Sequence, residues 1–295
     1  MLRFPKPHIH RIPALLGVLT VSAVLLLSAA RLTVAAATAT PEREPPTSIL
    51  LIGQDSREGE ATARADSILL CSFYTDDHRV LMTSFLRDLY VPIPGQESNR
   101  LNAAYAHGGM SLLRQTLQEN FGISIDGCVE VDFSNFSQVL DILGGVTIDL
   151  RQDEADAINK TIPGNLSEGM QHLSGDQALA YTRIRNLDKD GDFSRTNRQR
   201  KVISALLGSY KGVSLFTILS VIPEILPMLS TDMEQSQIIS TIIRLLPMIS
   251  ESTITSQQIP AKDKCTYSTI RGMAVLTADL KEIRRDLEQS LLSEK

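Results

Sequence analysis

Short apolar runs, separated by polar and glycine-containing stretches, follow residue 46. Residues 48–52, 67–74 and 79–85 lack the polar alternation of a half-exposed strand, so each run predicts a strand that is buried on both faces. The first run ends at Gly53 and is followed by polar residues. Open α/β sheets place their ligands at such strand exits, and we therefore expect the functional site there.

Strand and helix patterns continue to the end of the chain. Strands are expected at residues 127–133 and 146–150, and helices at residues 110–120, 135–143, 199–210, 237–249 and 279–292, with a further helix that begins near Ser174. Residues 213–229 are apolar, but Pro223, Glu224 and Pro227 argue against a membrane span. With residues 237–249 this segment is expected to form apolar helices that cover the sheet. A groove for a lipid tail is the alternative.

The N-terminal part of the chain predicts export. Residues 1–11 are basic and contain no acid, and the nineteen residues 12–30 carry no charge. A run of this length crosses the hydrocarbon core as a helix, and its basic flank predicts a cytoplasmic N-terminus. A signal peptide cleaved near residues 35–37 is the alternative.

Both interpretations place the remaining chain outside the cytoplasm. With a retained anchor, residues 31–46 form a linker, residues 47–295 form one extracytoplasmic domain, and the protein crosses the plasma membrane once.

Composition and charge narrow the class of protein. The 295 residues are 43% hydrophobic and only 5% aromatic, with no Trp, which suits an α/β domain better than an all-β sandwich. A net charge of −5 gives no electrostatic reason to expect nucleic acid as a partner. The histidines and cysteines form no HExxH or CxxC spacing, so a zinc site is not expected. Whether Cys128 and Cys265 form a disulfide is left open.

Positive charge is concentrated in residues 181–201. Five arginines and two lysines against three aspartates give this stretch a net charge of +4. If its first residues are extended, Arg183 and Arg185 project to one side. If a helix begins near Ser194, Arg195 and Gln199 share one of its faces, together with Arg198. Such a set of guanidinium groups would bind phosphate oxygens two at a time. A solvated basic face, or an ion-pair network with the aspartates, is the alternative.

Two carboxylates flank one predicted loop. Asp55 leaves the first strand and Asp66 enters the second. Because neighbouring strands lie about 4.8 Å apart, both carboxylates can approach one point. Mg²⁺ often takes one or two protein carboxylates and completes its shell with water and phosphate. Asp55 and Asp66 are therefore candidate magnesium ligands, unless each is a turn or cap residue. Arg87 follows the third strand and is a further candidate phosphate contact, with Asp88 beside it.

Seven segments carry a resemblance to the LytR-CpsA-Psr family of bacterial cell-envelope enzymes. They are GQDSR at 53–57, RADS at 64–67, SFLRD at 84–88, LNAAY at 101–105, LGGV at 143–146, LSGDQALAYTRIR at 173–185 and DFSRTNRQ at 192–199. Their order and spacing are specific to the family, although each segment alone is weak. The resemblance runs from about residue 48 to residue 292, together with the anchor before it.

The resemblance implies a single α/β domain with a central mixed sheet flanked by helices. It also implies a phosphotransferase that moves a teichoic acid or capsular type of glycopolymer from an undecaprenyl-pyrophosphate carrier to peptidoglycan through a phosphodiester. Membrane lipid and the peptidoglycan acceptor would be its partners. The apolar helices would enclose the polyprenyl chain.

The same resemblance assigns roles to individual residues. It implies that Asp55 and Asp66 hold Mg²⁺, which Mn²⁺ can replace, and that one of them is the general base. The pyrophosphate would be bound by Arg87, Arg183, Arg185, Arg195 and Gln199, with supporting contacts from Arg57, Arg64 and Arg198. Many relatives have Pro where this chain has Leu86, which predicts a looser turn before Arg87.

Two other functions stay open from the sequence. The same site could hydrolyse a lipid pyrophosphate with water as the acceptor. A polyprenyl-pyrophosphate-binding regulatory protein without enzymatic activity is the second alternative, against which the intact pair Asp55 and Asp66 argues.

Overall fold

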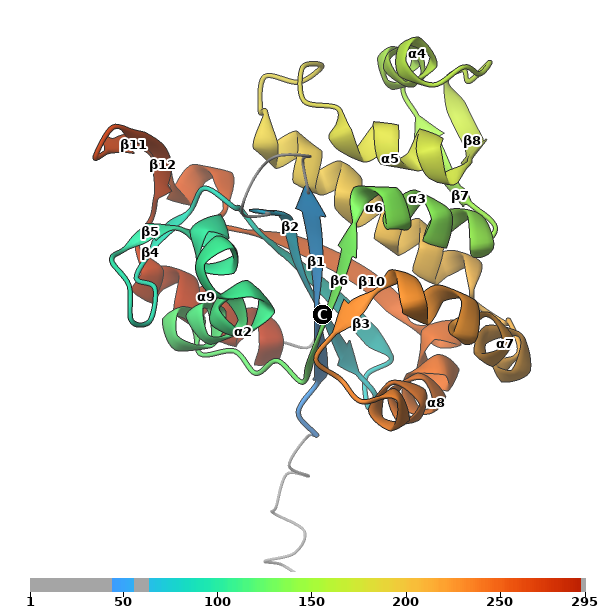
Figure 1. Ribbon diagram of the computed structural model, residues 1–295, viewed down its shortest axis with the longest axis horizontal. Helices are drawn as coiled ribbons and strands as arrows, with labels where there is room; N and C mark the ends of the chain where they lie inside the picture. Colours follow the sequence, from blue (N-terminus) through green and yellow to red (C-terminus); the bar gives the residue numbers. More distant parts are fainter. Residues whose placement is uncertain (1–43, 56–63, 293–295) are drawn as a thin grey trace, which may run out of the picture. The chain divides into compact units, whose positions relative to one another are not determined.

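A six-stranded mixed sheet forms the centre of the protein (Figure 1). The computed structural model describes residues 44–55 and 64–292. Across the sheet the strands follow the order β10-β3-β2-β1-β6-β9. Their bounds are Thr253–Ile259 for β10, Arg79–Phe85 for β3, Arg64–Tyr74 for β2, Thr47–Asp55 for β1, Gly127–Asp132 for β6 and Ser230–Thr231 for β9. The α/β fold with a central mixed sheet is therefore confirmed.

The strand directions bring three chain segments to one edge of the sheet. β2 pairs antiparallel with both β1 and β3, whereas β6 is parallel to β1 and β10 is parallel to β3. The carboxyl ends of β1 and β3 therefore lie at the same edge as the first residues of β2. The end of β1 at Asp55, the start of β2 at Arg64 and the turn after Phe85 all lie at this edge.

Helices cover both faces of the sheet because its strands are apolar on both sides. On one face α2 (Leu101–Phe121) and α9 (Leu280–Leu292) pack on residues such as Leu50 and Ile52. On the other face α6 (Asp192–Ser209) and α8 (Gln235–Glu251) pack on residues such as Ile49 and Leu69. The alternation of Ile49 and Leu50 between the two cores follows from the two-residue period of a strand.

A smaller apolar core lies beside the sheet, under α6. It is built by α3 (Phe133–Ile142), β7 (Val146–Leu150), α4 (Gln152–Thr161), β8 (Gly169–Leu173) and α5 (Gly175–Arg183). Tyr181 of α5 and Val202 of α6 are both fully buried in it, so this core fixes α6 relative to α5.

The remaining elements are short or lie at the periphery. They are β4 (Tyr90–Val91), β5 (Asn99–Arg100), α7 (Leu215–Ile225), the 3₁₀ turn η1 (Leu226–Met228), the 3₁₀ turn η2 (Lys262–Lys264), β11 (Thr266–Ile270) and β12 (Met273–Thr277). Cys71, Cys128 and Cys265 are all free thiols, so the disulfide that the sequence left open is absent.

Several sequence expectations match the structure closely, and two are wrong. Strands at 79–85 and 146–150 have the predicted bounds. The stretch 181–183 is helical instead of extended, because α5, which Ser174 caps, continues to Arg183. Helix α6 begins at Asp192 after Gly191, so Ser194 lies inside the helix and is not its cap.

The predicted anchor at residues 12–30 and the linker at 31–46, apart from its last three residues, lie outside the described residues. In the part of the chain that the structure does describe, no helix has both the length and the hydropathy to cross a bilayer.

Gly175 offers a test of the contact between α3 and α5. A Cβ atom at Gly175 would lie 1.9 Å from the carbonyl oxygen of Ser137, whereas a Cβ atom at Gly208, near the end of α6, would meet nothing within 4 Å. We expect Gly175→Ala to lower the free energy of unfolding by about 1–3 kcal/mol through overpacking. The matched variant Gly208→Ala should raise it by about 0.5–1 kcal/mol, because alanine favours a helix. Urea denaturation measures both, and a neutral Gly175→Ala would contradict the close contact.

Candidate anion-binding site

The buried carboxylate of Asp66 lies at the centre of a cluster of arginines. Only 6% of Asp66 is exposed. Its Oδ1 accepts a hydrogen bond from Nη1 of Arg87, in the turn after β3. Its Oδ2 lies 3.7 Å from Nη2 of Arg185 and 4.0 Å from Nη1 of Arg195. The strand exits and the basic stretch, distant in sequence, thus meet around one carboxylate.

Helix α6 supplies the most buried member of this cluster. Arg195 is 2% exposed, and its Nη2 donates to the backbone carbonyl of Asp66 at 3.1 Å and contacts Oδ1 of Asp192 at 2.7 Å. Oδ2 of Asp192 lies 3.8 Å from Nε of Arg87. Asp192, to which the sequence analysis gave no role, therefore links Arg87 and Arg195.

Apolar packing holds the turn before Arg87 against α6. Leu86 is fully buried in a small cluster with Phe193 and Leu276. The amide of Leu86 donates to the carbonyl of Ile259 at 2.8 Å, a hydrogen bond that proline could not form. The expectation that Leu86 loosens this turn is therefore wrong, because Leu86 ties the turn to β10 and to the first turn of α6.

The two central arginines differ in how their charge is compensated. Burial disfavours the charged form of Arg87, but the carboxylates of Asp192 and Asp66 outweigh burial and raise its pKa. Burial lowers the pKa of Arg195, and Arg87 and Arg185 add to that effect, while Asp192 opposes it. Nε of Arg87 and Nε of Arg195 have no hydrogen-bond partner among the described residues. A bound anion would supply the missing acceptors and counter-charge.

The two arginines at the end of α5 and just after it are more accessible. Arg185 has a side chain that is 46% exposed, so it can move toward a ligand. The guanidinium of Arg183 lies over the ring of Phe133, 4.4 Å from the centroid, which is a cation–π contact. Both arginines also line an open groove of about 410 Å³ between α4, α5 and residues 184–187.

Not every predicted site residue joins the cluster. Arg198 points away from Asp66: its Nε contacts Glu154 of α4 at 2.9 Å, its Nη1 donates to the carbonyl of Ile184 at 3.3 Å, and its Nη2 contacts Asp188. Both Arg198 and Glu154 are almost fully buried. The sequence analysis missed Glu154, since no local pattern pairs residues 44 positions apart.

The other predicted residues lie nearby or outside the described part. Arg64 is exposed at the start of β2, opposite the backbone of Asp55. Gln199 faces an apolar cavity. The side chain of Asp55 and all of Arg57 lie outside the described residues.

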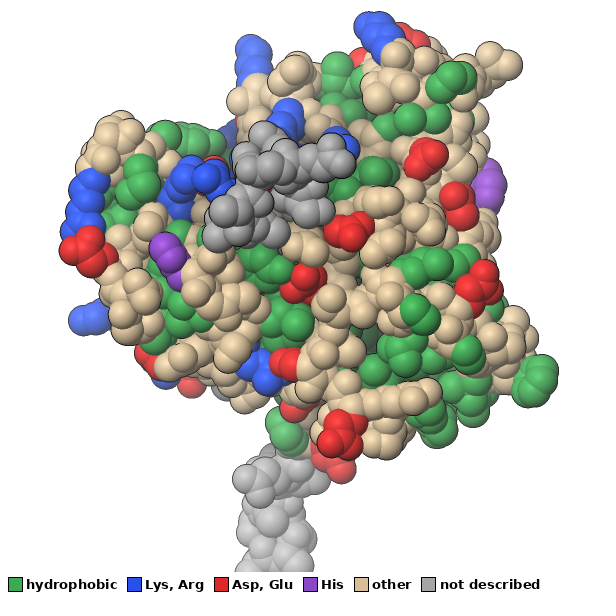
Figure 2. Space-filling model, viewed as in Figure 1, with side chains coloured by type: hydrophobic (Ala, Val, Ile, Leu, Met, Phe, Trp, Pro, Cys, Tyr) green, Lys and Arg blue, Asp and Glu red, His purple; other side chains and the backbone are tan. Residues whose placement is uncertain are grey.

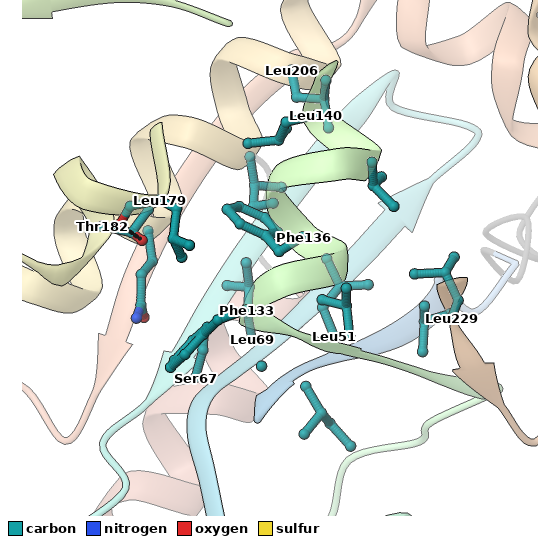
Figure 3. Close-up of a pocket in the computed structure, with 17 residues that line it drawn as sticks. Leu51, Ser67, Leu69, Phe133, Phe136, Leu140, Leu179, Thr182, Leu206 and Leu229 are labelled. Atoms are coloured by element: carbon teal, nitrogen blue, oxygen red, sulfur yellow. Dashed lines mark hydrogen bonds between the residues drawn. The ribbon is translucent and has the colours of Figure 1, made fainter. Parts of the chain in front are cut away.

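This apolar cavity, which we call the α3 cavity, has a volume of about 170 Å³ and lies between α3, α5, α6 and the sheet (Figure 3). Ser67 and Thr182 line it, and they are adjacent in sequence to Asp66 and Arg183. Phe133 lines it as well and carries Arg183 on its ring. The polar cluster therefore adjoins one end of an apolar space.

A second apolar cavity borders the α3 cavity on the same face of the sheet. Val129 and Leu229 line the α3 cavity and also line this second cavity of about 230 Å³, the α7–α8 cavity, which lies against α7, η1 and α8. Figure 3 places Leu229 on the opposite side of the α3 cavity from Thr182 and Leu179. The two cavities are therefore neighbours that share two apolar side chains.

The residues for a metal site are described only in part. Within residues 44–55 and 64–292, no three His, Cys, Asp or Glu residues are grouped so that they could hold a metal. Asp66 fits a Mg²⁺ site of the kind that uses one or two protein carboxylates with phosphate and water. Among the described residues its Oδ2 accepts no hydrogen bond, and Nη2 of Arg185 lies 3.7 Å away.

Comparison with known proteins identifies the family. The model of the LytR_cpsA_psr family matches residues 27–289. The chain belongs to this family.

Relatives within the family carry two kinds of name. The chain is 38% identical over 161 residues to the regulatory protein MsrR of Staphylococcus aureus, covering 54% of this chain and 47% of that protein. It is 36% identical over 185 residues to the polyisoprenyl-teichoic acid–peptidoglycan teichoic acid transferase TagU of Bacillus mycoides, covering 62% and 58% respectively. The matches thus span about half the length of these relatives.

Solved structures of TagT share the fold. TagT bound to LIIa-WTA is 28% identical, with a TM-score of 0.68, and the match covers 86% of this chain and 98% of that one. TagT with bound octaprenyl pyrophosphate lipid is 26% identical, with a TM-score of 0.64, and the match covers 84% and 91%. TagT therefore combines this fold with an octaprenyl pyrophosphate ligand.

Stability measurements can test whether Arg198 has a structural role that Arg185, in the cluster around Asp66, does not have. Arg198→Ala would leave Glu154 buried without a partner, and we expect the free energy of unfolding to fall by about 3–5 kcal/mol. The control Arg185→Ala removes a half-exposed side chain and should change it by less than about 0.5 kcal/mol. Equal values from chemical denaturation of the two variants would contradict a structural role for Arg198.

Proposed function

We propose that this protein transfers an anionic cell-wall glycopolymer from a polyprenyl-pyrophosphate carrier to peptidoglycan. The observation that carries the proposal is the junction between the arginine cluster around Asp66 and the α3 cavity. A polyprenyl pyrophosphate has a dianionic head and a long apolar tail, so it requires these two environments side by side. Undecaprenyl is the carrier that the family resemblance implies.

In this proposal the arginines bind the pyrophosphate and the cavities bind the tail. Arg87, Arg185 and Arg195 would contact its non-bridging oxygens, since Nε of Arg87 and Nε of Arg195 form no hydrogen bond with any described residue. Arg183 lies at the boundary between the two environments, on the ring of Phe133. Gln199 and Arg64 are secondary candidates, and Arg57 stays a prediction from the sequence.

The reaction would form one phosphodiester and break one phosphoanhydride bond. A peptidoglycan hydroxyl oxygen attacks the phosphorus that carries the glycan, the bond from this phosphorus to the bridging oxygen breaks, and polyprenyl phosphate leaves with the bridging oxygen. Phosphoryl transfer depends mainly on positioning and charge neutralisation, which the guanidinium groups provide. The hydroxyl proton needs a base, for which Asp55 and Asp66 are the candidates.

Asp66, with Asp55, would hold Mg²⁺ or Mn²⁺ beside the pyrophosphate. When bound, such a cation neutralises charge on the phosphate oxygens. The open groove beside Arg183 and Arg185 is the proposed place for sugar residues next to the reacting phosphorus. We also propose a plasma-membrane location with an extracytoplasmic catalytic domain, on the basis of residues 1–30.

Some relatives are named as regulatory proteins, so a binding function without enzymatic activity is the second candidate. Hydrolysis of the same lipid is the third, and it differs only in that water replaces the sugar hydroxyl. Product analysis distinguishes the three: a glycan–peptidoglycan phosphodiester, free glycan phosphate, or unchanged lipid.

Loss of a cluster arginine should abolish transfer. We expect Arg183→Ala and Arg195→Ala to lower kcat by at least about 100-fold, because each removes a fixed cation from the transition state. Arg285→Ala, on the exposed side of α9, is the matched control and should leave kcat unchanged. The measurement is product formation from a synthetic polyprenyl-pyrophosphate glycan and peptidoglycan fragments in Mg²⁺, with and without chelator. Full activity of Arg195→Ala would refute the proposed site.

A bulky side chain between the two cavities should weaken binding of the polyprenyl tail and leave binding of the pyrophosphate unchanged. Leu229 lines both cavities, so Leu229→Trp should obstruct long polyprenyl chains. We expect affinity for an undecaprenyl pyrophosphate to fall about tenfold or more, whereas affinity for a short prenyl pyrophosphate should stay the same. Calorimetric titration with both lipids measures the difference. Equal losses for both lipids would show that the substitution disturbs the pyrophosphate site instead.

A further inference from the structure

Helix α7 presents an unusually apolar surface. Its sequence, LFTILSVIPEI, contains one charged residue, Glu224, and Ile225 is its only fully buried residue. Phe216 is 84% exposed, and Leu215 beside it is 36% exposed. On the neighbouring helix α8, Ile243 is 47% exposed. A helix with this composition is normally covered by other apolar groups.

The exposed side chains form part of one surface. Figure 2 shows hydrophobic side chains gathered on the side of the molecule where Figure 1 places α7 and α8. The same two helices enclose the α7–α8 cavity through Ile222, Ile225 and Ile242. The helices of this apolar surface therefore also line the α7–α8 cavity, which adjoins the α3 cavity at Val129 and Leu229.

The chain enters the described structure beside this surface. Thr47 is the first residue of β1, and its hydroxyl accepts a hydrogen bond of 2.5 Å from Nη2 of Arg244 on α8. In sequence, sixteen residues separate Thr47 from the uncharged run 12–30, which is long enough to span a bilayer. A spacer of that length can reach at most about 55 Å when fully extended. A membrane-anchored chain would thus hold α8 within reach of the bilayer.

We propose that the outer face of α7 and α8, around Leu215, Phe216 and Ile243, docks on the lipid bilayer. Phe216 would insert among the acyl chains near the headgroups, and the α7–α8 cavity would open toward the membrane. A lipid tail could then pass from the bilayer to the α3 cavity without crossing water. Only the nature of that tail rests on the proposed function. The docking itself requires a bilayer but no particular lipid tail.

The first test uses vesicles that contain no polyprenyl lipid. The unit Pro45–Lys295 is compact and has its own cores, and it lacks residues 12–30, which would bind lipid themselves. We expect it to sediment with vesicles of phosphatidylethanolamine and phosphatidylglycerol. Phe216→Asp should weaken this binding about tenfold or more, because it puts a charge in place of the aromatic ring that would insert among the acyl chains.

Tyr267→Asp is the matched control. Tyr267 is an aromatic residue that is 70% exposed on β11, far from α7 in sequence. Its replacement should leave vesicle binding unchanged, and both variants should keep the parent melting temperature, since neither side chain is buried. Failure of the parent unit to bind vesicles, or equal binding by Phe216→Asp, would overturn the proposal and assign the surface to a protein partner.

The full chain provides a second test that does not depend on transferase activity. In a Cys265→Ser background, Phe216→Cys and Tyr267→Cys each place one reactive thiol on the surface, because Cys71 and Cys128 are buried. A nitroxide at position 216 should show lipid-like access to oxygen when the protein is reconstituted in the same vesicles, and a nitroxide at position 267 should show aqueous access. Aqueous access at both positions would overturn the docking, even if transfer itself were observed.

Discussion

The compensation of one buried carboxylate organises this protein. Asp66 lies at the edge of the central sheet, where an uncompensated charge would be costly, and its partners come from other segments. Arg87 follows β3, and Arg195 lies in α6, 129 residues after Asp66. Both arginine side chains must reach the start of β2. The antiparallel pairing of β2 with β3 brings Arg87 there, and the position of α6 brings Arg195 there, so the cluster needs both. The packing of Leu86 on Phe193 supports the same contact with apolar surface.

Around Asp66 the arginines keep hydrogen-bond donors unused, and these donors distinguish the cluster from a structural ion pair. Arg198 shows the contrast, because Glu154 and Asp188 satisfy it and it faces away from the cluster. Arg195 is equally buried, yet its Nε has no hydrogen-bond partner among the described residues, and burial lowers its pKa. An anionic ligand next to an apolar cavity completes this arrangement.

Apolar surface is used in two ways in this fold. Between the sheet and its helices it forms ordinary cores, in which strands such as β3 are buried along their whole length. Around α3, α7 and α8 it leaves cavities and an exposed face instead. Both features suit a protein that handles a lipid, because water must be kept from the tail throughout its path. The TagT structure with octaprenyl pyrophosphate shows that a related protein of this fold binds such a lipid.

The sequence by itself determined the local features: the strands at residues 79–85 and 146–150, the start of a helix near Ser174, and the accumulation of arginines after residue 181. These depend on neighbouring residues, so they can be recognised without a fold. Tertiary structure decided which arginines serve the site. It placed Arg198 on Glu154, added β10 to the sheet beside β3, and brought Asp192 between two arginines. The physical reason is that burial and ion pairing depend on residues distant in sequence, and a local pattern contains no information about them.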